Sequence, residues 1–226
     1  MTDKLTGAAG RRYVTDAIRE SLRAGDLVPG QRLVENDLAE SYGTTRSAVR
    51  EALQDLAAEE IVELVPRRGA RIRAVSVDEA IQITECRSAL EQLCAAKAAT
   101  RVNEAQRAEL RRIGTEMRQA VADGAVHAYS ALNQRLHELV VEASGQEVAR
   151  RQLERLNGPM VRFQFRLALR PGRPAQSLRQ HLDIIDGILS GDATAAARAA
   201  AAHLDDVIEQ LRSSAAAPSA PVPPRT

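Results

Sequence analysis

The chain has few of the residues on which several classes of protein depend. Only 2% of its 226 residues are aromatic, Trp is absent and Cys occurs twice. A core with so few aromatic rings has to be aliphatic and rich in Ala, which suits packed helices better than a β-sandwich. The hydrophobic content of 44% is still sufficient for a packed core. We therefore expect a folded, mostly α-helical protein.

The sequence also lacks segments that direct a chain to or through a membrane. No run approaches the roughly 20 apolar residues that span a bilayer, and residues 1–12 lack the apolar centre of a signal peptide. Cys86 and Cys94 are about 12 Å apart along one expected helix, which is too far for a disulfide. These features predict a cytoplasmic protein with reduced thiols and no membrane partner.

A marked excess of positive charge, common in nucleic-acid-binding proteins, is absent as well. The formal net charge is +1, and residues 11–73 contain eleven Arg against eleven Asp and Glu. A role in DNA binding therefore has to be argued from where the arginines stand, not from their number.

The first part of the chain contains three stretches of apolar residues at helical spacing, over residues 13–22, 33–42 and 45–56. Gly43 separates the second stretch from the third, and Thr45 is suited to cap the third. Two helices joined by a short turn that contains Gly predict a helix-turn-helix.

The polar face of the third stretch carries Arg46 and Arg50, which are neighbours at a spacing of four. Both lie in the N-terminal half, the part of a recognition helix that enters the major groove. Arg can donate two hydrogen bonds to guanine there. The alternative is that both are solvated arginines paired with Glu51 or other acids, an arrangement worth about 0–1 kcal/mol.

Two short strand-like runs follow, at residues 61–65 and 70–73, on either side of a turn that contains Pro and Gly. This pattern predicts a β-hairpin. Its tip and return strand contain four arginines and no acid: Arg67, Arg68, Arg71 and Arg73. A basic hairpin beside a recognition helix is a wing that can reach phosphates or the minor groove.

In this order, residues 11–74 resemble the GntR family of transcription regulators. The motifs that carry the resemblance are Gln31-Arg32-Leu33, Asp37-Leu38-Ala39, the stretch from Thr45 to Leu53, and Pro66-Arg67-Arg68-Gly69-Ala70. The resemblance implies DNA contacts from Thr45, Arg46, Ser47, Arg50, Arg67, Arg68 and Gly69. No contact is carried over to Asn36, where some members have Arg.

From Ser76, which with Glu79 forms a capping-box pattern, the periodicity is helical throughout. We expect helices at 78–100, 104–122, 125–143, 147–157, 159–169, 176–190 and 193–212. The predicted fold is thus mostly α: a winged helix-turn-helix of three helices and a β-hairpin over residues 8–75, then an antiparallel bundle of six or seven helices over 76–212. Residues 213–226, rich in Ala, Ser and Pro, predict a disordered tail.

Three of the four histidines lie on apolar stripes of the bundle, namely His137, His181 and His203, with Asn133 one turn before the first. His127 fits no stripe, and we expect it to be exposed. Each inward histidine alone is more often a core residue than a ligand. Imidazoles from three helices with one oxygen donor nevertheless match a site for Zn, Ni or Mn.

Residues 78–212 also resemble the FCD ligand-binding domain of the FadR-type branch of the GntR family. The matching motifs are Glu85-Cys86-Arg87, Leu90-Glu91, Asn133 to His137, Gln180-His181-Leu182 and Ala202-His203-Leu204. The resemblance implies a divalent metal held by Asn133, His137, His181 and His203, with a small organic acid bound on or beside it. Asn133 stands where Asp is commoner, which weakens metal retention or favours an anionic effector.

Arg87, which faces inward on its apolar stripe, is suited to bind the carboxylate of such an effector bidentately. Arg162 and Arg166, one turn apart, are weaker candidates, because a solvated cationic face explains them better than an effector site does.

These features predict a homodimeric repressor or activator, with a repressor favoured, that binds a palindromic DNA operator and responds to a small carboxylic acid. One alternative is a regulator whose effector is the metal ion itself. Another is a metal-dependent hydrolase, but the sequence has no HExxH motif and no nucleophile paired with His. We therefore expect no enzymatic activity.

Overall fold

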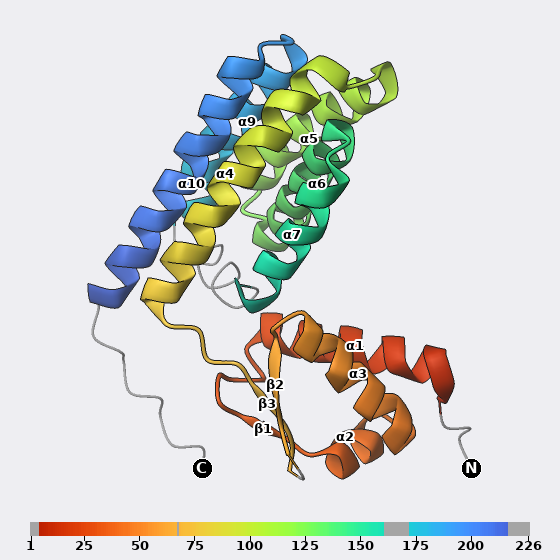
Figure 1. Cartoon of the computed structure of the whole chain (residues 1–226). Coiled ribbons are helices and arrows are strands. Elements are labelled where there is room, and N and C mark those ends of the chain that lie inside the picture. Colours follow the sequence, from red (N-terminus) through yellow and green to blue (C-terminus); the bar gives the residue numbers. More distant parts are fainter. Residues whose placement is uncertain (1–4, 67, 161–171, 217–226) are drawn as a thin grey trace. The chain divides into compact units, whose positions relative to one another are not determined.

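The computed structural model describes residues 5–66, 68–160 and 172–216 (Figure 1). Their contacts divide the chain into two compact units. One contains the described residues up to 75 together with 150–160, and the other contains residues 76–149 together with 172–216. Each unit has its own core, and the two are described separately.

Three helices and a small sheet make up the winged helix-turn-helix of the first unit. The helices are α1 (Gly7–Ala24), α2 (Glu35–Ser41) and α3 (Arg46–Ala58). The strands are β1 (Arg32–Leu33), β2 (Val62–Val65) and β3 (Gly69–Ile72). The sheet is antiparallel in the order β1-β3-β2, with Val62 opposite Ile72 and Leu33 opposite Ala70. The predicted hairpin is confirmed, whereas the third strand, β1, was not predicted.

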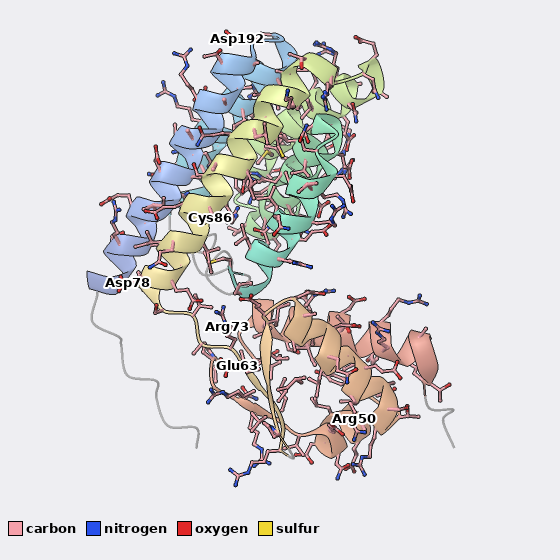
Figure 2. The ribbon with its side chains drawn as sticks, in the orientation of Figure 1. Arg50, Glu63, Arg73, Asp78, Cys86 and Asp192 are labelled. Carbon is pink, nitrogen blue, oxygen red and sulfur yellow. The ribbon has the colours of Figure 1, made fainter. Side chains whose placement is uncertain are left out.

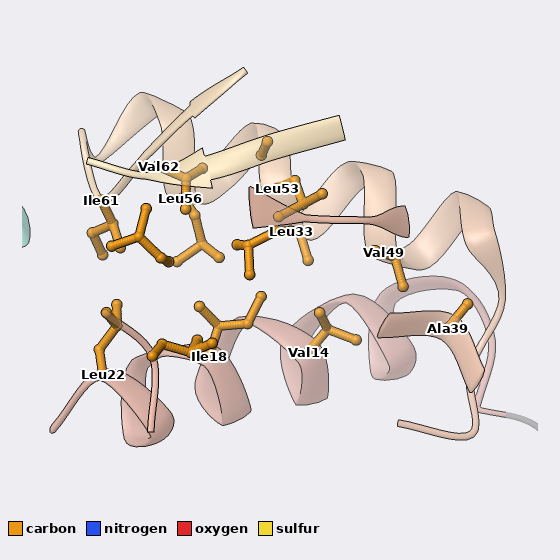
Figure 3. Close-up of a cluster of buried hydrophobic side chains, with 14 residues drawn as sticks. Val14, Ile18, Leu22, Leu33, Ala39, Val49, Leu53, Leu56, Ile61 and Val62 are labelled. Atoms are coloured by element: carbon orange, nitrogen blue, oxygen red, sulfur yellow. The ribbon is translucent and has the colours of Figure 1, made fainter. Parts of the chain in front are cut away.

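The core of this unit lies between α1, α3 and the sheet (Figure 3). Val14 and Ile18 of α1 are completely buried and belong to one cluster with Val49 and Leu53 of α3. Residues four apart in a helix lie on one face, which is why the apolar spacing in the sequence becomes a contact surface. This packing fixes α3 with its polar face outward.

The second unit is a bundle in which all described secondary structure is helical. Its elements are α4 (Val77–Arg101), α5 (Glu104–Ala122), α6 (Val126–Ser144), α9 (Arg173–Leu189) and α10 (Ala193–Ala216). Helix α7 (Glu147–Asn157) begins in this unit, but from residue 150 it is assigned to the first unit, as is the 3-10 turn at Gly158–Met160 that follows it. In Figure 1, α10 runs alongside α4, which also packs against α6.

The helix positions follow the apolar periodicity, with three differences. Helix α9 begins at Arg173, three residues before the predicted start, because Pro174 is compatible with the first turn of a helix. Residues 213–216 belong to α10, although we predicted that the tail would begin there; the run of Ala and Ser continues the helix by one turn. Of the predicted helix 159–169, residues 159 and 160 belong to the 3-10 turn, and the rest lies outside the described residues. Within the described part of the chain, no helix combines the length and apolar character needed to cross a membrane.

Candidate metal centre and nucleic-acid interface

Three histidines from three helices meet inside the second unit. They are His137 of α6, His181 of α9 and His203 of α10. Their ring centroids are 4.5 to 5.5 Å apart, and one ring nitrogen of each lies within 4.8 Å of the others. His181 is 1% exposed and His203 is 6% exposed. We call these three residues the histidine cluster.

The Nδ1 atom of each ring contacts a neighbour outside the cluster. His137 Nδ1 is 3.1 Å from Glu91 Oε2, and His203 Nδ1 is 3.2 Å from Gln180 Oε1. His181 Nδ1 is 2.8 Å from the hydroxyl of Tyr129. With Nδ1 engaged in each ring, Nε2 is the nitrogen left for a shared ligand.

Two buried acceptor atoms accompany this arrangement. Among the described residues, Nε2 of His181 and Oδ1 of Asn133 are buried and have no hydrogen-bond partner. Asn133 lies one turn before His137 on α6. A buried polar atom without a partner is costly in free energy, and a cation removes that cost for an atom that offers a lone pair. The donor set therefore fits a divalent metal.

The electrostatics keep two of the histidines in the form that binds metals. Burial, together with the positive field of neighbours that include Arg173, holds the pKa of His181 and of His203 well below the usual range. Both rings are therefore neutral near pH 7. Burial also raises the pKa of Tyr129 to about 12, so its hydroxyl keeps its proton.

A buried ion pair borders the cluster. Arg87 Nη2 donates to Glu91 Oε1 at 2.7 Å, and both side chains are about nine-tenths buried. Burial by itself would raise the pKa of Glu91, but the charges of Arg87 and then His137 outweigh it and lower the pKa to about 2. Glu91 is therefore an anion, and Arg87 already holds one carboxylate. The Nε–H of Arg87 is buried and has no partner among the described residues.

The structure also places one arginine near the site that the sequence analysis did not single out. Arg173, at the start of α9, was not singled out, yet it is 7% exposed and pairs with Asp206 of α10. Arg162 and Arg166 lie outside the described residues.

A pocket beside the histidine cluster is lined by apolar side chains together with Glu91 and His137. The sequence signal for Glu91 was its position four residues after Arg87, because such residues are neighbours on a helix.

The first unit presents the residues predicted to contact DNA on the start of α3. Thr45 caps the helix, since its hydroxyl accepts from the Ala48 N–H at 3.3 Å. Arg46, Ser47 and Arg50 are exposed, and Figure 2 labels Arg50. Thr45 is thus a structural residue of α3 as well as a predicted contact.

Arg50 forms an ion pair with an acid, which agrees with the alternative interpretation of this residue as a surface arginine paired with an acid. The partner is Glu35 of α2 and not Glu51. Arg50 Nε and Nη2 donate to the two Glu35 oxygens at 3.1 and 2.8 Å. This hydrogen bonding lowers the pKa of Glu35 against the effect of burial, and the charge of Arg46 contributes to the decrease.

On the wing, the basic charge is partly neutralised by acids of the neighbouring strand and turn. Arg71 donates to Glu63 at 2.7 Å, and Arg73 pairs with Glu60 at 3.5 Å. Arg68 is exposed, and Arg67 lies outside the described residues.

Comparison with known proteins agrees with both halves of this description. Residues 11–72 match the family model described as bacterial regulatory proteins, gntR family, and residues 82–206 match the FCD domain. The chain belongs to the GntR family and carries an FCD domain. The families and their named members are regulators of transcription, not enzymes. The chain is therefore a GntR-family transcription regulator.

Individual relatives of this GntR-family chain are distant but span most of it. It is 26% identical over 186 residues to the HTH-type transcriptional repressor RspR of Escherichia coli, covering 82% of each protein. It is 27% identical to the regulator YdhC of Bacillus subtilis, covering 86% of this chain and 88% of that protein. Among solved structures, E. coli McbR/YncC shares the fold with a TM-score of 0.80 at 21% identity, over 92% of this chain and 100% of that one.

Proposed function

We propose that this GntR-family regulator is a homodimeric repressor whose FCD domain binds a divalent metal and a small organic acid. The histidine cluster, with its Nε2 atoms left for a shared ligand, is the observation that carries the proposal. Binding of the acid shifts the regulator between a state that binds its operator and one that does not. Repression is proposed because RspR, a relative over 82% of the chain, is named a repressor.

His137, His181, His203 and Asn133 would hold the metal. Neutral imidazoles and an amide oxygen suit Zn, Ni or Mn. The ion would supply a Lewis-acidic positive centre for the oxygens of a carboxylate. Because Asn133 and metal-bound imidazoles would add no charge to the site, and because Glu91 is balanced by Arg87, the charge of the ion is left for the effector to neutralise. This favours an anionic effector, with the Arg87 Nε–H as an additional donor.

Operator binding would use the exposed start of α3 and the tip of the wing. Thr45, Arg46, Ser47 and Arg50 are the proposed contacts on α3, and Arg67, Arg68 and Gly69 are those on the wing. Two copies of the head in a symmetric dimer would read a palindromic site in successive major grooves.

Titration of the metal-free protein with Zn²⁺, Ni²⁺ and Mn²⁺ against a chromophoric chelator tests the metal site. We expect one ion per chain, and His203→Gln should weaken binding whereas His127→Gln, a change on the exposed face of α6, should not. A thermal-shift screen of small carboxylic acids on the metal-loaded protein tests the effector, since a ligand of the folded state raises the melting temperature. Failure of every metal to bind would refute the metal centre.

Recognition of bases by α3 is tested by measuring the affinity of Arg46→Ala and Arg50→Ala for operator and random duplexes. If these residues read bases, each change should cost about 1–3 kcal/mol on the operator and less on random DNA. Arg112→Ala, at an exposed ion pair of α5, is the matched control. Equal losses on both duplexes would assign the two arginines to phosphate contacts alone.

A regulator whose effector is the metal itself is the second candidate, and the same histidine cluster supports it. The two are separated by measuring operator affinity with and without a chelator and with and without the acids found in the screen. A change with the chelator and none with any acid would favour the metal as effector.

A further inference from the structure

We infer that Tyr129 and Ser177 form a hydrogen-bond relay that fixes the tautomer of His181, with the proton on Nδ1 and the lone pair on Nε2. The relay makes both residues positioning residues for the metal centre, and in that respect it rests on the proposed function. It is a chain of three contacts. His181 Nδ1 is 2.8 Å from Tyr129 Oη, Tyr129 Oη is 2.9 Å from Ser177 Oγ, and Ser177 Oγ is 3.0 Å from the carbonyl oxygen of Arg173.

The hydrogen bond from Ser177 to Arg173 determines which group donates and which accepts along the relay. A backbone carbonyl can only accept, so Ser177 donates its single hydroxyl proton to Arg173 O, with Pro174 O at 3.4 Å as a weaker second acceptor. The Ser177 oxygen is then left to accept, and the Tyr129 hydroxyl has to donate to it. Since Tyr129 has no other proton to give, its oxygen accepts from His181, which places the imidazole proton on Nδ1.

The opposite direction leaves a buried donor without an acceptor. If Tyr129 donated to Nδ1, the proton of neutral His181 would sit on Nε2, which has no partner among the described residues. His181 is 1% exposed, Tyr129 is 4% exposed and Ser177 is 5% exposed, so bulk solvent does not reach these groups. An unsatisfied N–H at such depth is costly in free energy. A lone pair at the same place is what a divalent cation requires.

The three histidines differ in whether the partner of Nδ1 alone determines the tautomer of the ring. Glu91 and the Oε1 atom of Gln180 are acceptors by their chemistry, so the Nδ1 atoms they contact must carry the protons. Tyr129 can accept or donate, and its contact with His181 is compatible with either tautomer. Ser177, which is hydrogen-bonded to Tyr129, removes that ambiguity. Partners of metal-bound histidines are known to set the ring tautomer in this way.

The first test is the tautomer itself, read by long-range ¹H–¹⁵N correlation NMR of ¹⁵N-histidine-labelled, metal-free protein near pH 7. His181 should show a protonated Nδ1 and a bare Nε2. In Ser177→Ala, Nδ1 of His181 is the one acceptor left to the Tyr129 proton among the described residues, so the His181 proton should move to Nε2. A wild-type His181 with its proton on Nε2 would overturn the relay, whether or not the protein binds metal.

The second test is a double-mutant cycle on Zn²⁺ affinity, measured by chelator competition. Ser177→Ala should weaken binding about 10- to 100-fold, the range for such supporting partners. In the Tyr129→Phe background the same Ser177→Ala change should have no further effect, because no hydroxyl remains to be redirected. The control is Thr84→Ala, which removes another buried hydroxyl bonded to the carbonyl four residues earlier, and it should retain wild-type affinity.

The outcomes separate the relay from the metal centre. Equal losses from Ser177→Ala in both backgrounds would indicate a packing effect and would refute the relay. Wild-type protein that binds no metal but shows the Nδ1–H tautomer would refute the proposed metal centre and leave the relay in place.

Discussion

Arg50 of α3 donates from Nε and Nη2 to the two carboxylate oxygens of Glu35 in α2, at 3.1 and 2.8 Å. The pair joins the two helices of the helix-turn-helix on their exposed side, with 58% of the Arg50 side chain accessible. Glu35 thereby fixes the plane of the guanidinium and leaves its Nη1 side for a second acceptor. A carboxylate at a DNA-binding face repels phosphates, so its presence favours selection of sequence over affinity alone.

We therefore expect Glu35→Gln to raise affinity for random duplex DNA severalfold while lowering the ratio of operator to random affinity about tenfold. The first effect follows from the lost repulsion, and the second from an Arg50 that is no longer oriented for a bidentate contact. Fluorescence anisotropy at two salt concentrations measures both. Glu59→Gln, at the Arg19–Glu59 pair of the same unit, is the control. An unchanged ratio would show that Glu35 does not position Arg50.

Gly69 at the start of β3 is required by the backbone on two grounds. Its φ is +86°, and a Cβ there would lie 2.4 Å from the carbonyl oxygen of Leu33 in β1. Gly30 has a similar φ of +77°, but a Cβ would meet nothing within 4 Å. We expect Gly30→Ala to cost about 1–2 kcal/mol of unfolding free energy from φ alone. Gly69→Ala should cost more, because the wing must move away from β1.

Urea unfolding followed by circular dichroism compares the two alanine variants. Equal losses would mean that the sheet adapts to a side chain without strain. The comparison also bears on the predicted DNA contact at Gly69, because a variant with a displaced wing would lose DNA affinity without any missing contact.

The extent to which the sequence predicted this structure depended on the range of each interaction. Apolar periodicity and the Thr45 cap are local, and they gave the helix-turn-helix. Strand β1 has two residues and no periodicity of its own, and it exists because β3 offers it partners. The histidines were visible as polar residues on apolar stripes. Tyr129 was not singled out, because its contact with Ser177 joins residues 48 positions apart and no local pattern marks it.

The buried histidines should make the metal-free protein sensitive to mild acid. The pKa values of His181 and His203 are lowered by burial in the folded state, so the unfolded chain binds more protons than the folded one below about pH 6.5. Stability should therefore be fully present above that pH and fall as pH decreases, by up to about 1.4 kcal/mol per pH unit for each such histidine. The loss should continue until the pH reaches the lowered pKa values.

Urea unfolding of metal-free protein between about pH 7 and pH 5 measures this dependence. His203→Gln should reduce the slope, and exposed His127→Gln should leave it unchanged. A slope that is the same in His203→Gln and wild type would show that this ring is not buried as a neutral group.

The neutral side chain of Asn133 should lower the affinity for the metal and raise the affinity of the loaded site for the acid effector. An Asp carboxylate at this position would donate more strongly and would reduce the positive charge of the loaded site by one. We expect Asn133→Asp to tighten Zn²⁺ binding by about tenfold or more, and to weaken binding of the acid effector, because less positive charge is left for the acid to neutralise.

The Oδ1 atom of Asn133 is buried without a partner among the described residues, so the change places a charge where only a cation would balance it. The metal-free variant should therefore be less stable than wild type and should regain that stability with Zn²⁺. Gln134→Glu adds the same charge on the exposed side of α6 and should change neither affinity. Tighter binding of both metal and acid in Asn133→Asp would show that the charge of the ion does not govern effector affinity.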